Sequence, residues 1–223
     1  MFRLDATALS AAIIDLDGTL IDTLGDFNGA LNGMLDELAL PGVNPARIAQ
    51  LIGKGSEHLV ASVLALVRGE AAPPDLFERA FAAYQRHYAG VNGRHATVFP
   101  GADEGLKALR ERGWKLACLT NKPTAFAQAL LRDKGLAGYF DVCFGGDAFE
   151  KKKPDPLPLL KTCEALGTLP AQTLMVGDSS NDAQAARAAG CPVILVTYGY
   201  NHGQPVRQVD ADGFVDSLAG MLD

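Results

Sequence analysis

The hydrophobic positions of this chain change their period near residue 98. Beyond it, short apolar runs typical of buried strands alternate with segments of helical period. The predicted strands are 11–16, Lys115–Thr120, Val142–Gly145, Thr173–Gly177 and Val193–Thr197. The predicted helices are 102–112, 123–134, 156–166 and 181–189, each followed by a glycine. This alternation predicts an α/β fold, in which a Rossmann-like parallel sheet has helices on both faces.

The segment between residues 24 and 95 shows a helical period and almost no strand pattern. Its apolar side chains recur at helical spacing, as in Leu31, Leu35 and Leu38, then Leu59, Val63 and Val67, then Phe77, Phe81 and Tyr84. Because strand patterns stand on either side, we expect an all-helical insertion. The predicted organisation is a Rossmann-like core made of residues 1–23 and 96–223, and an inserted helical domain made of residues 24–95.

The most informative polar segment is Asp15-Leu16-Asp17-Gly18-Thr19, directly after the first apolar run. Ligands of open parallel sheets bind at the carboxyl ends of the strands, where this segment lies. Two aspartates one residue apart can supply a nucleophile, a proton donor and ligands for a metal ion. The simpler interpretation is a strand-ending turn with solvated aspartates.

Three other strand ends or loops carry polar side chains that suit the same chemistry. Thr120 and Asn121 follow one strand, the run Lys151–Lys153 precedes a proline, and Asp178 and Asp182 follow another strand. Helix capping alone would explain Thr120 or Asn121, and a solvated loop would explain much of the lysine run. Capping would explain one of the two later aspartates, but hardly both. Together these groups suit a phosphoryl group held beside Mg²⁺.

Composition and charge limit the kinds of binding partner that we expect for this protein. The chain has 223 residues, of which 48% are hydrophobic and 21% charged, and a formal net charge of −6. This balance lacks the basic footprint of a nucleic-acid-binding protein, so we expect an anionic substrate held by local positive groups. Four scattered cysteines suggest neither a disulfide framework nor a zinc site. Without a signal-peptide pattern or a membrane span, we expect a cytoplasmic protein, a monomer or small homo-oligomer.

The motifs Asp-x-Asp-Gly-Thr, strand-end Thr, Lys-Pro and Gly-Asp-x-x-x-Asp occur in this order, and the sequence resembles the haloacid dehalogenase-like superfamily along essentially the whole chain. Within it, the sequence is similar to bacterial phosphoglycolate phosphatases. The residues that carry this second resemblance are Leu20-Ile21-Asp22-Thr23, Phe99-Pro100-Gly101, Thr120-Asn121-Lys122-Pro123, Gly177-Asp178-Ser179-Ser180-Asn181-Asp182 and Tyr198-Gly199-Tyr200-Asn201-His202-Gly203.

The resemblance implies a role for each catalytic group. Asp15 would attack phosphorus, form an aspartyl-phosphate and bind Mg²⁺. Asp17 would protonate the leaving oxygen, activate water and bind Mg²⁺ through its backbone carbonyl. Thr120 would hydrogen-bond the phosphoryl oxygens, and Lys153 would neutralise the nucleophile and the transferring group.

The resemblance also implies metal and substrate contacts around these groups. Asp178 would be the second carboxylate ligand of the metal, and Asp182 would support the metal through water or an outer-shell bond. Substrate contacts are expected from Asn121, Gly18 and Thr19.

The helical insertion resembles the superfamily's cap, which closes over the site and excludes water. Its turn Gly53-Lys54-Gly55-Ser56 could direct backbone N–H groups, or Lys54 itself, at a substrate carboxylate. The simpler interpretation is a turn that starts a helix, with Lys54 in solvent.

The expected function is therefore a magnesium-dependent phosphomonoester hydrolase that converts 2-phosphoglycolate to glycolate and phosphate. An aspartate at position 17 suits cleavage of a P–O bond, because the leaving oxygen needs a proton. The resemblance also argues against dehalogenation and phosphonate cleavage, because dehalogenases of the superfamily do not use this second aspartate and phosphonate-cleaving members replace it. Hydrolysis of another small phosphoester or of pyrophosphate stays open, as does a sugar phosphomutase of the same fold. A non-enzymatic phosphoester-binding module is disfavoured, because it would have no use for a proton donor.

Overall fold

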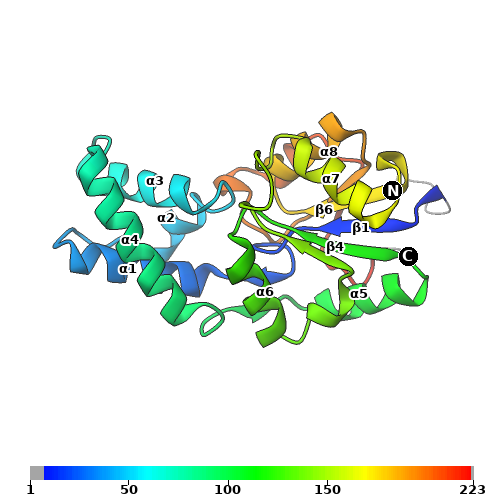
Figure 1. Cartoon of the computed structure of the whole chain (residues 1–223), viewed down its shortest axis with the longest axis horizontal. Helices are drawn as coiled ribbons and strands as arrows, with labels where there is room; N and C mark the ends of the chain where they lie inside the picture. The colour runs from blue at the N-terminus through cyan, green and yellow to red at the C-terminus, as the bar shows by residue number, and fades with distance from the viewer. Residues whose placement is uncertain (1–7, 222–223) are drawn as a thin grey trace.

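Six parallel strands form the centre of this computed structural model, which describes residues 8–221 (Figure 1). In spatial order they are β5 (Val142–Phe144), β4 (Lys115–Leu119), β1 (Ala11–Ile14), β6 (Thr173–Gly177), β7 (Val193–Val196) and β8 (Gly213–Val215). In the register of the central strands, Ile14 lies opposite both Cys118 and Val176. The residues that follow β1, β4 and β6 therefore emerge side by side at one edge of the sheet.

Helices cover both faces of this sheet, as the sequence pattern predicted. On one face lie α5 (Ala102–Glu111) and α6 (Thr124–Asp133), and on the other α7 (Leu157–Leu166) and α8 (Ser180–Ala189) (Figure 1). Alternate strand residues point to opposite faces, so Ala12 and Ile14 join the first apolar layer, whereas Ala11 and Ile13 join the second. The α/β fold with a parallel sheet is confirmed.

Residues 24–91 form four helices beyond the carboxyl ends of the central strands (Figure 1). They are α1 (Leu24–Glu37), α2 (Pro45–Ala49), α3 (Ser56–Arg68) and α4 (Pro74–Val91). Their apolar faces form a hydrophobic cluster of their own, which includes Leu31, Val63 and Tyr84. This separate core supports the proposed division of the chain, although residues 1–7 of the predicted core lie outside the described residues.

Two connections join the helices to the sheet, and they are tied to each other. The short strands β2 (Ile21–Asp22) and β3 (Thr97–Val98) pair antiparallel. Next to them, the buried Asp26 carboxylate accepts hydrogen bonds from the backbone N–H groups of Gly93 (2.6 Å) and His95 (2.8 Å). The chain therefore leaves the sheet and returns to it through one hydrogen-bonded junction.

The boundaries of the predicted elements differ from the observed ones by two residues at most. The pattern missed β2, β3 and β8, because two or three residues are too few to show a period. The remaining elements are the single-turn helices η2 (Ala137–Tyr139), η3 (Pro170–Gln172), η4 (Asn201–Gly203) and η5 (Val206–Gln208). Within residues 8–221, no helix combines the length and hydrophobicity needed to cross a membrane.

The Asp26 junction yields a stability prediction. We expect Asp26→Ala to lower the free energy of unfolding by about 2–3 kcal/mol, because two backbone N–H groups lose their acceptor. Urea unfolding followed by circular dichroism measures this change. The control is Asp36→Ala on the exposed side of the same helix, expected to change stability by less than about 0.5 kcal/mol. Equal stability of the two variants would contradict a structural role for the junction.

Candidate active site

The carboxyl edge of the sheet gathers polar residues from four separate segments. Asp15 follows β1, Thr120 follows β4, Asp178 follows β6, and Lys153 lies in the loop between β5 and α7. All four side chains are buried. Because parallel strands end together at this edge, residues distant in sequence meet in one place.

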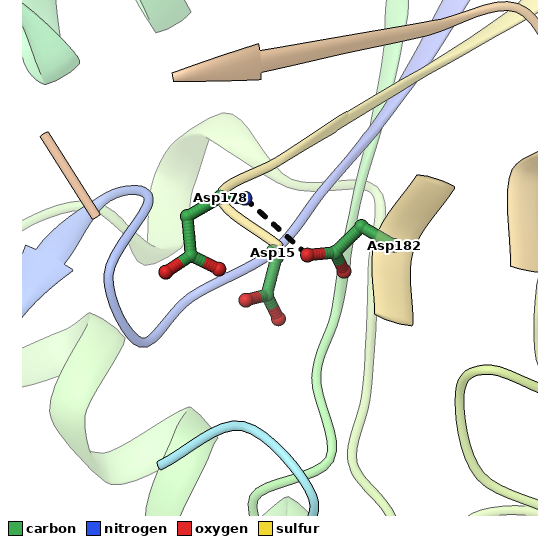
Figure 2. Close-up of side chains that lie close together, drawn as sticks. All are labelled: Asp15, Asp178 and Asp182. Atoms are coloured by element: carbon green, nitrogen blue, oxygen red, sulfur yellow. Dashed lines mark hydrogen bonds between the residues drawn. The ribbon is translucent and has the colours of Figure 1, made fainter. Parts of the chain in front are cut away.

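Three carboxylates form an acidic group at this edge. One oxygen from each of Asp15, Asp178 and Asp182 lies within 4.8 Å of the others (Figure 2). The Asp17 side chain lies outside this group, because its Oδ1 accepts a hydrogen bond of 2.8 Å from Lys122 Nζ. The expected metal contact through the Asp17 backbone carbonyl stays a prediction.

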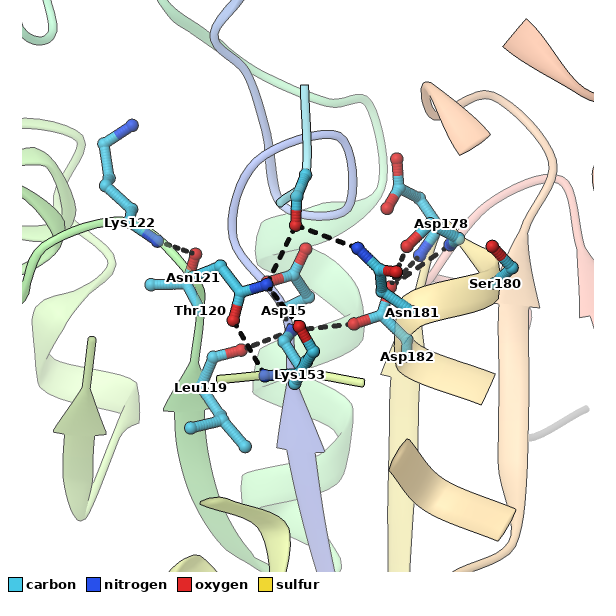
Figure 3. A network of polar contacts seen from close by, with 12 residues as sticks. Asp15, Leu119, Thr120, Asn121, Lys122, Lys153, Asp178, Ser180, Asn181 and Asp182 are labelled. Carbon is cyan, nitrogen blue, oxygen red and sulfur yellow. Dashed lines mark hydrogen bonds and ion pairs between the residues drawn. The ribbon is translucent and has the colours of Figure 1, made fainter. Parts of the chain in front are cut away.

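Lys153 lies among these acids (Figure 3). Its Nζ donates to Asp15 Oδ1 (2.8 Å), to Asp182 Oδ1 (2.7 Å) and to the carbonyl oxygen of Leu119 (2.8 Å). Burial opposes the charge of Lys153, but Asp15 and Asp182 outweigh this effect and raise its pKa. The structure thus places Lys153, and not the exposed Lys151, against the acidic group.

The site carries more buried negative charge than its lysines neutralise. Burial raises the pKa of Asp15 to about 7, although Lys153 acts in the opposite direction. Burial, followed by repulsion from Asp182, also raises the pKa of Asp178 well above its usual range. The buried charges of the site are those of Asp15, Asp17, Asp178 and Asp182 against Lys122 and Lys153. A divalent cation would balance the excess, and the all-oxygen donor set fits Mg²⁺.

Both carboxylate oxygens of Asp182 accept hydrogen bonds from neighbouring residues. Its Oδ2 accepts hydrogen bonds from the Ser179 backbone N–H (3.1 Å) and hydroxyl (2.8 Å) and from the Asp178 N–H (3.3 Å), while Oδ1 accepts from Lys153. Ser179 and Asp182 form a capping box at the start of α8. This arrangement fits the indirect role expected for Asp182, which stays a proposal.

Two glycines make room for Asp178. Gly18 has a φ of +88°, and a Cβ at Gly18 or at Gly199 would overlap the Asp178 side chain. The backbone N–H of Tyr200 donates to Asp178 Oδ2 at 2.6 Å, which orients the carboxylate. The N–H of Gly18 donates to the carbonyl of Ile21. The structure thus gives Gly18 a steric role, and its expected substrate contact stays a prediction.

A small cavity, with a volume of about 30 Å³, lies between this edge of the sheet and helices α1, α3 and α4. Asp15, Asp17 and Thr120 line it from the sheet side. Ser56 and Tyr84 are among the residues that line it from the helix side. Asp15 of the acidic group, Asp17 and the strand-end threonine therefore border one cavity.

Three other residues that the sequence assigned to substrate binding are Asn121, Thr19 and Lys54. Asn121 lines the cavity, as expected for such a residue, and its amide also donates to the carbonyls of Gly53 and Lys153 and accepts from the Lys153 N–H, so it positions that lysine. Thr19 is fully buried and is not among the residues that line the cavity. Lys54 is exposed and does not line it either, whereas Gly53 does. The substrate contacts of these three residues stay predictions.

Lys122 is a site residue that sequence reasoning missed. It is buried, bonds Asp17 and lies over the rings of Phe27 (4.6 Å from Nζ to the centroid) and Tyr88 (4.9 Å). Such contacts stabilise a desolvated ammonium group. The only sequence signal was its place in Thr120-Asn121-Lys122-Pro123, which helix capping also explains.

Comparisons with known proteins agree on one family. A family model described as haloacid dehalogenase-like hydrolase matches residues 9–190. A phosphoglycolate phosphatase of Thiobacillus denitrificans is 46% identical, over 95% of this chain and 93% of the relative. One of Nitrosospira multiformis is 47% identical, over 94% of this chain and 92% of the relative. The crystal structure of a predicted phosphoglycolate phosphatase from Haemophilus somnus 129PT is similar to this structure with a TM-score of 0.91 and 32% identity, over 96% of this chain and 97% of that one.

The packing around Asp178 yields a prediction about metal binding. A methyl group in Gly199→Ala would displace the Asp178 carboxylate, so we expect most of the Mg²⁺-induced rise in Tm to be lost. Thermal unfolding with and without saturating Mg²⁺ measures this rise, and the metal-free Tm reports whether the variant folds. The control is Gly138→Ala, where no atom lies within 4 Å of the added carbon. A full Mg²⁺ response in Gly199→Ala would remove Asp178 from the metal site.

Proposed function

This chain belongs to the haloacid dehalogenase-like hydrolase family, and from that premise we propose that it is a magnesium-dependent phosphatase that hydrolyses 2-phosphoglycolate to glycolate and phosphate. The observation that carries the proposal is the contact of Asp15 with Lys153 inside an acidic group that lines a cavity. The names of the relatives at 46% and 47% identity support this substrate.

Asp15, Asp178 and the backbone carbonyl of Asp17 would hold Mg²⁺, with Asp182 supporting them indirectly. When bound, the ion supplies positive charge against the oxygens of the phosphoryl group. The excess of buried negative charge supports this assignment, because the site's lysines alone do not compensate it.

Asp15 is the proposed nucleophile. Its carboxylate attacks phosphorus, a new bond forms between the carboxylate oxygen and phosphorus, and the bond from phosphorus to the ester oxygen breaks. Lys153, held at 2.8 Å from Asp15 Oδ1, orients this carboxylate and counters the charge of the transferring group. Water then attacks phosphorus in the resulting aspartyl-phosphate, which releases phosphate and restores the Asp15 carboxylate.

Asp17 is the proposed proton carrier. It lines the cavity next to Asp15 and would give a proton to the leaving ester oxygen in the first step. In the second step its carboxylate would take a proton from the attacking water, so that the enzyme returns to its starting state. The hydrogen bond from Lys122 fixes Asp17 Oδ1 and supports this role through positioning.

Thr120 would bind the phosphoryl oxygens. It lines the cavity, and its Oγ1 accepts a hydrogen bond from the Lys122 N–H at 3.3 Å, which leaves the hydroxyl proton to donate to a phosphoryl oxygen. Helices α1 to α4 would act as a cap that keeps other water away from the aspartyl-phosphate. Their separate hydrophobic core supports the division into a cap of residues 24–95 and a core made of the rest.

Loss of the nucleophile gives the first functional test. We expect Asp15→Asn to lower phosphate release at least about 10³-fold, because an amide cannot form the acyl-phosphate bond. Colorimetric phosphate release from 2-phosphoglycolate in the presence of Mg²⁺ measures this loss. Asp75→Asn, a change of the same kind at an exposed position on α4, should keep wild-type activity. An active Asp15→Asn enzyme would rule out nucleophilic catalysis by this residue.

Metal removal and a substrate panel give the second test. We expect EDTA to abolish phosphate release and added Mg²⁺ to restore it. We also expect a higher kcat/KM for 2-phosphoglycolate than for other small phosphoesters or pyrophosphate. Isomerised sugar phosphate without free phosphate would instead identify a phosphomutase. Full activity in EDTA would contradict the assigned metal dependence.

A further inference from the structure

The helix side of the cavity is lined by two tyrosines whose buried hydroxyl groups lack partners. Tyr84 and Tyr88 lie one turn apart on α4, each is 1% exposed, and both line the cavity. Among the described residues, neither hydroxyl has a hydrogen-bond partner. Buried polar groups in proteins are nearly always hydrogen-bonded, so this pair calls for an explanation.

The two tyrosines cannot easily turn away from the cavity. Their rings stack on each other with centroids 5.4 Å apart, and the Tyr88 ring also stacks on Phe27 at 5.4 Å. Phe126 of α6, on the sheet side, packs edge-on against Tyr88 at 5.0 Å. Interlocked rings on three helices hold the hydroxyls in place, which is the pre-organisation that a binding site requires.

The residues that line the cavity from the helix side offer hydrogen-bond donors. Burial raises the pKa of both tyrosines well above the usual range, so each keeps its proton. The Ser56 hydroxyl lies near that of Tyr84 and lowers its pKa slightly, without the geometry of a hydrogen bond. Ser56 also begins α3, which no side chain caps, so the first N–H groups of this helix are additional donors at the cavity.

These donors on the helix side of the cavity therefore suit an anionic group that accepts hydrogen bonds. No carboxylate lines the cavity from the helix side in the described part of the chain, and the Lys122 ammonium lies 4.9 Å from the centroid of the Tyr88 ring. The small cavity must also hold the phosphoryl group, next to Asp15 and Asp17 on the sheet side. The space that remains suits a short group that accepts several hydrogen bonds, such as a carboxylate.

We propose that Tyr84 and Tyr88, together with the first N–H groups of α3, bind a carboxylate on the leaving group of the substrate. The proposal rests on the proposed function, because the phosphoryl group at Asp15 leaves the rest of the substrate facing α3 and α4. It assigns the enzyme to short, carboxylate-bearing phosphoesters. It also replaces Lys54, which is exposed, as the carboxylate-binding side chain.

The test compares two substrates of equal carbon number. 2-Phosphoglycolate carries the carboxylate, and ethyl phosphate lacks it. Tyr84→Phe and Tyr88→Phe each remove one hydroxyl and keep the ring. We expect each to raise the KM for 2-phosphoglycolate about tenfold with little change in kcat, because a hydrogen bond to a charged group is lost. The ratio of kcat/KM between the two substrates should fall by a similar factor.

Tyr139→Phe is the matched control, because it removes a hydroxyl on η2, outside the cavity. Lys122 is not a suitable test position, because its bond to Asp17 links it to proton transfer. Equal losses for both substrates in Tyr84→Phe and Tyr88→Phe would overturn the proposal and indicate a packing role. An unchanged ratio would overturn it as well.

Measurements on the wild-type enzyme distinguish failure of the carboxylate-site proposal from failure of the proposed phosphatase function. If it hydrolyses ethyl phosphate as efficiently as 2-phosphoglycolate, the phosphatase assignment stands and the carboxylate site is wrong. If it hydrolyses neither substrate in the presence of Mg²⁺, the proposed function itself fails. Strong preference for 2-phosphoglycolate, lost on removal of either hydroxyl, would support both.

Discussion

Four carboxylates buried at one edge of a parallel sheet impose the constraint on which the rest of this structure depends. Charged groups away from water repel one another strongly and are stable only when they are paired or bind a cation. Burial, together with repulsion from neighbouring carboxylates, raises the pKa of Asp15 and of Asp178. A divalent cation bound at this edge, as proposed, would stabilise the charged form of these groups.

Each lysine in turn depends on a neighbour that holds it in place. The Asn121 amide bonds both the N–H and the carbonyl of Lys153, and it also bonds the carbonyl of Gly53 in the helical segment. Phe27 and Tyr88, also from the helices, lie against the ammonium group of Lys122. The helical segment therefore contributes to the electrostatics of the site as well as covering it.

The loop after β7 connects the acidic group with the junction between sheet and helices. The backbone N–H of Tyr200 bonds Asp178, while its hydroxyl donates to Asp22 and accepts from the Thr23 N–H. A few residues along the chain from Thr23, the Asp26 carboxylate accepts hydrogen bonds from the N–H groups of Gly93 and His95, where the chain returns to the sheet. Tyr200 thus contacts the acidic group through its backbone N–H and the segment that leads into α1 through its hydroxyl, so the position of the helices and the orientation of Asp178 are physically linked.

The sequence by itself determined the alternation of strands and helices, the helical insertion and the strand-end groups Asp15, Thr120, Asp178 and Lys153. Periodicity and strand-end motifs are local, so they survive without a structure. Only the tertiary structure decided that Lys122 is buried against Asp17, that Asn121 positions Lys153, and that Tyr84 and Tyr88, with their buried hydroxyls, line the cavity. Those properties come from contacts between segments far apart in the chain, where partners and burial, and not residue type, set the role of a side chain.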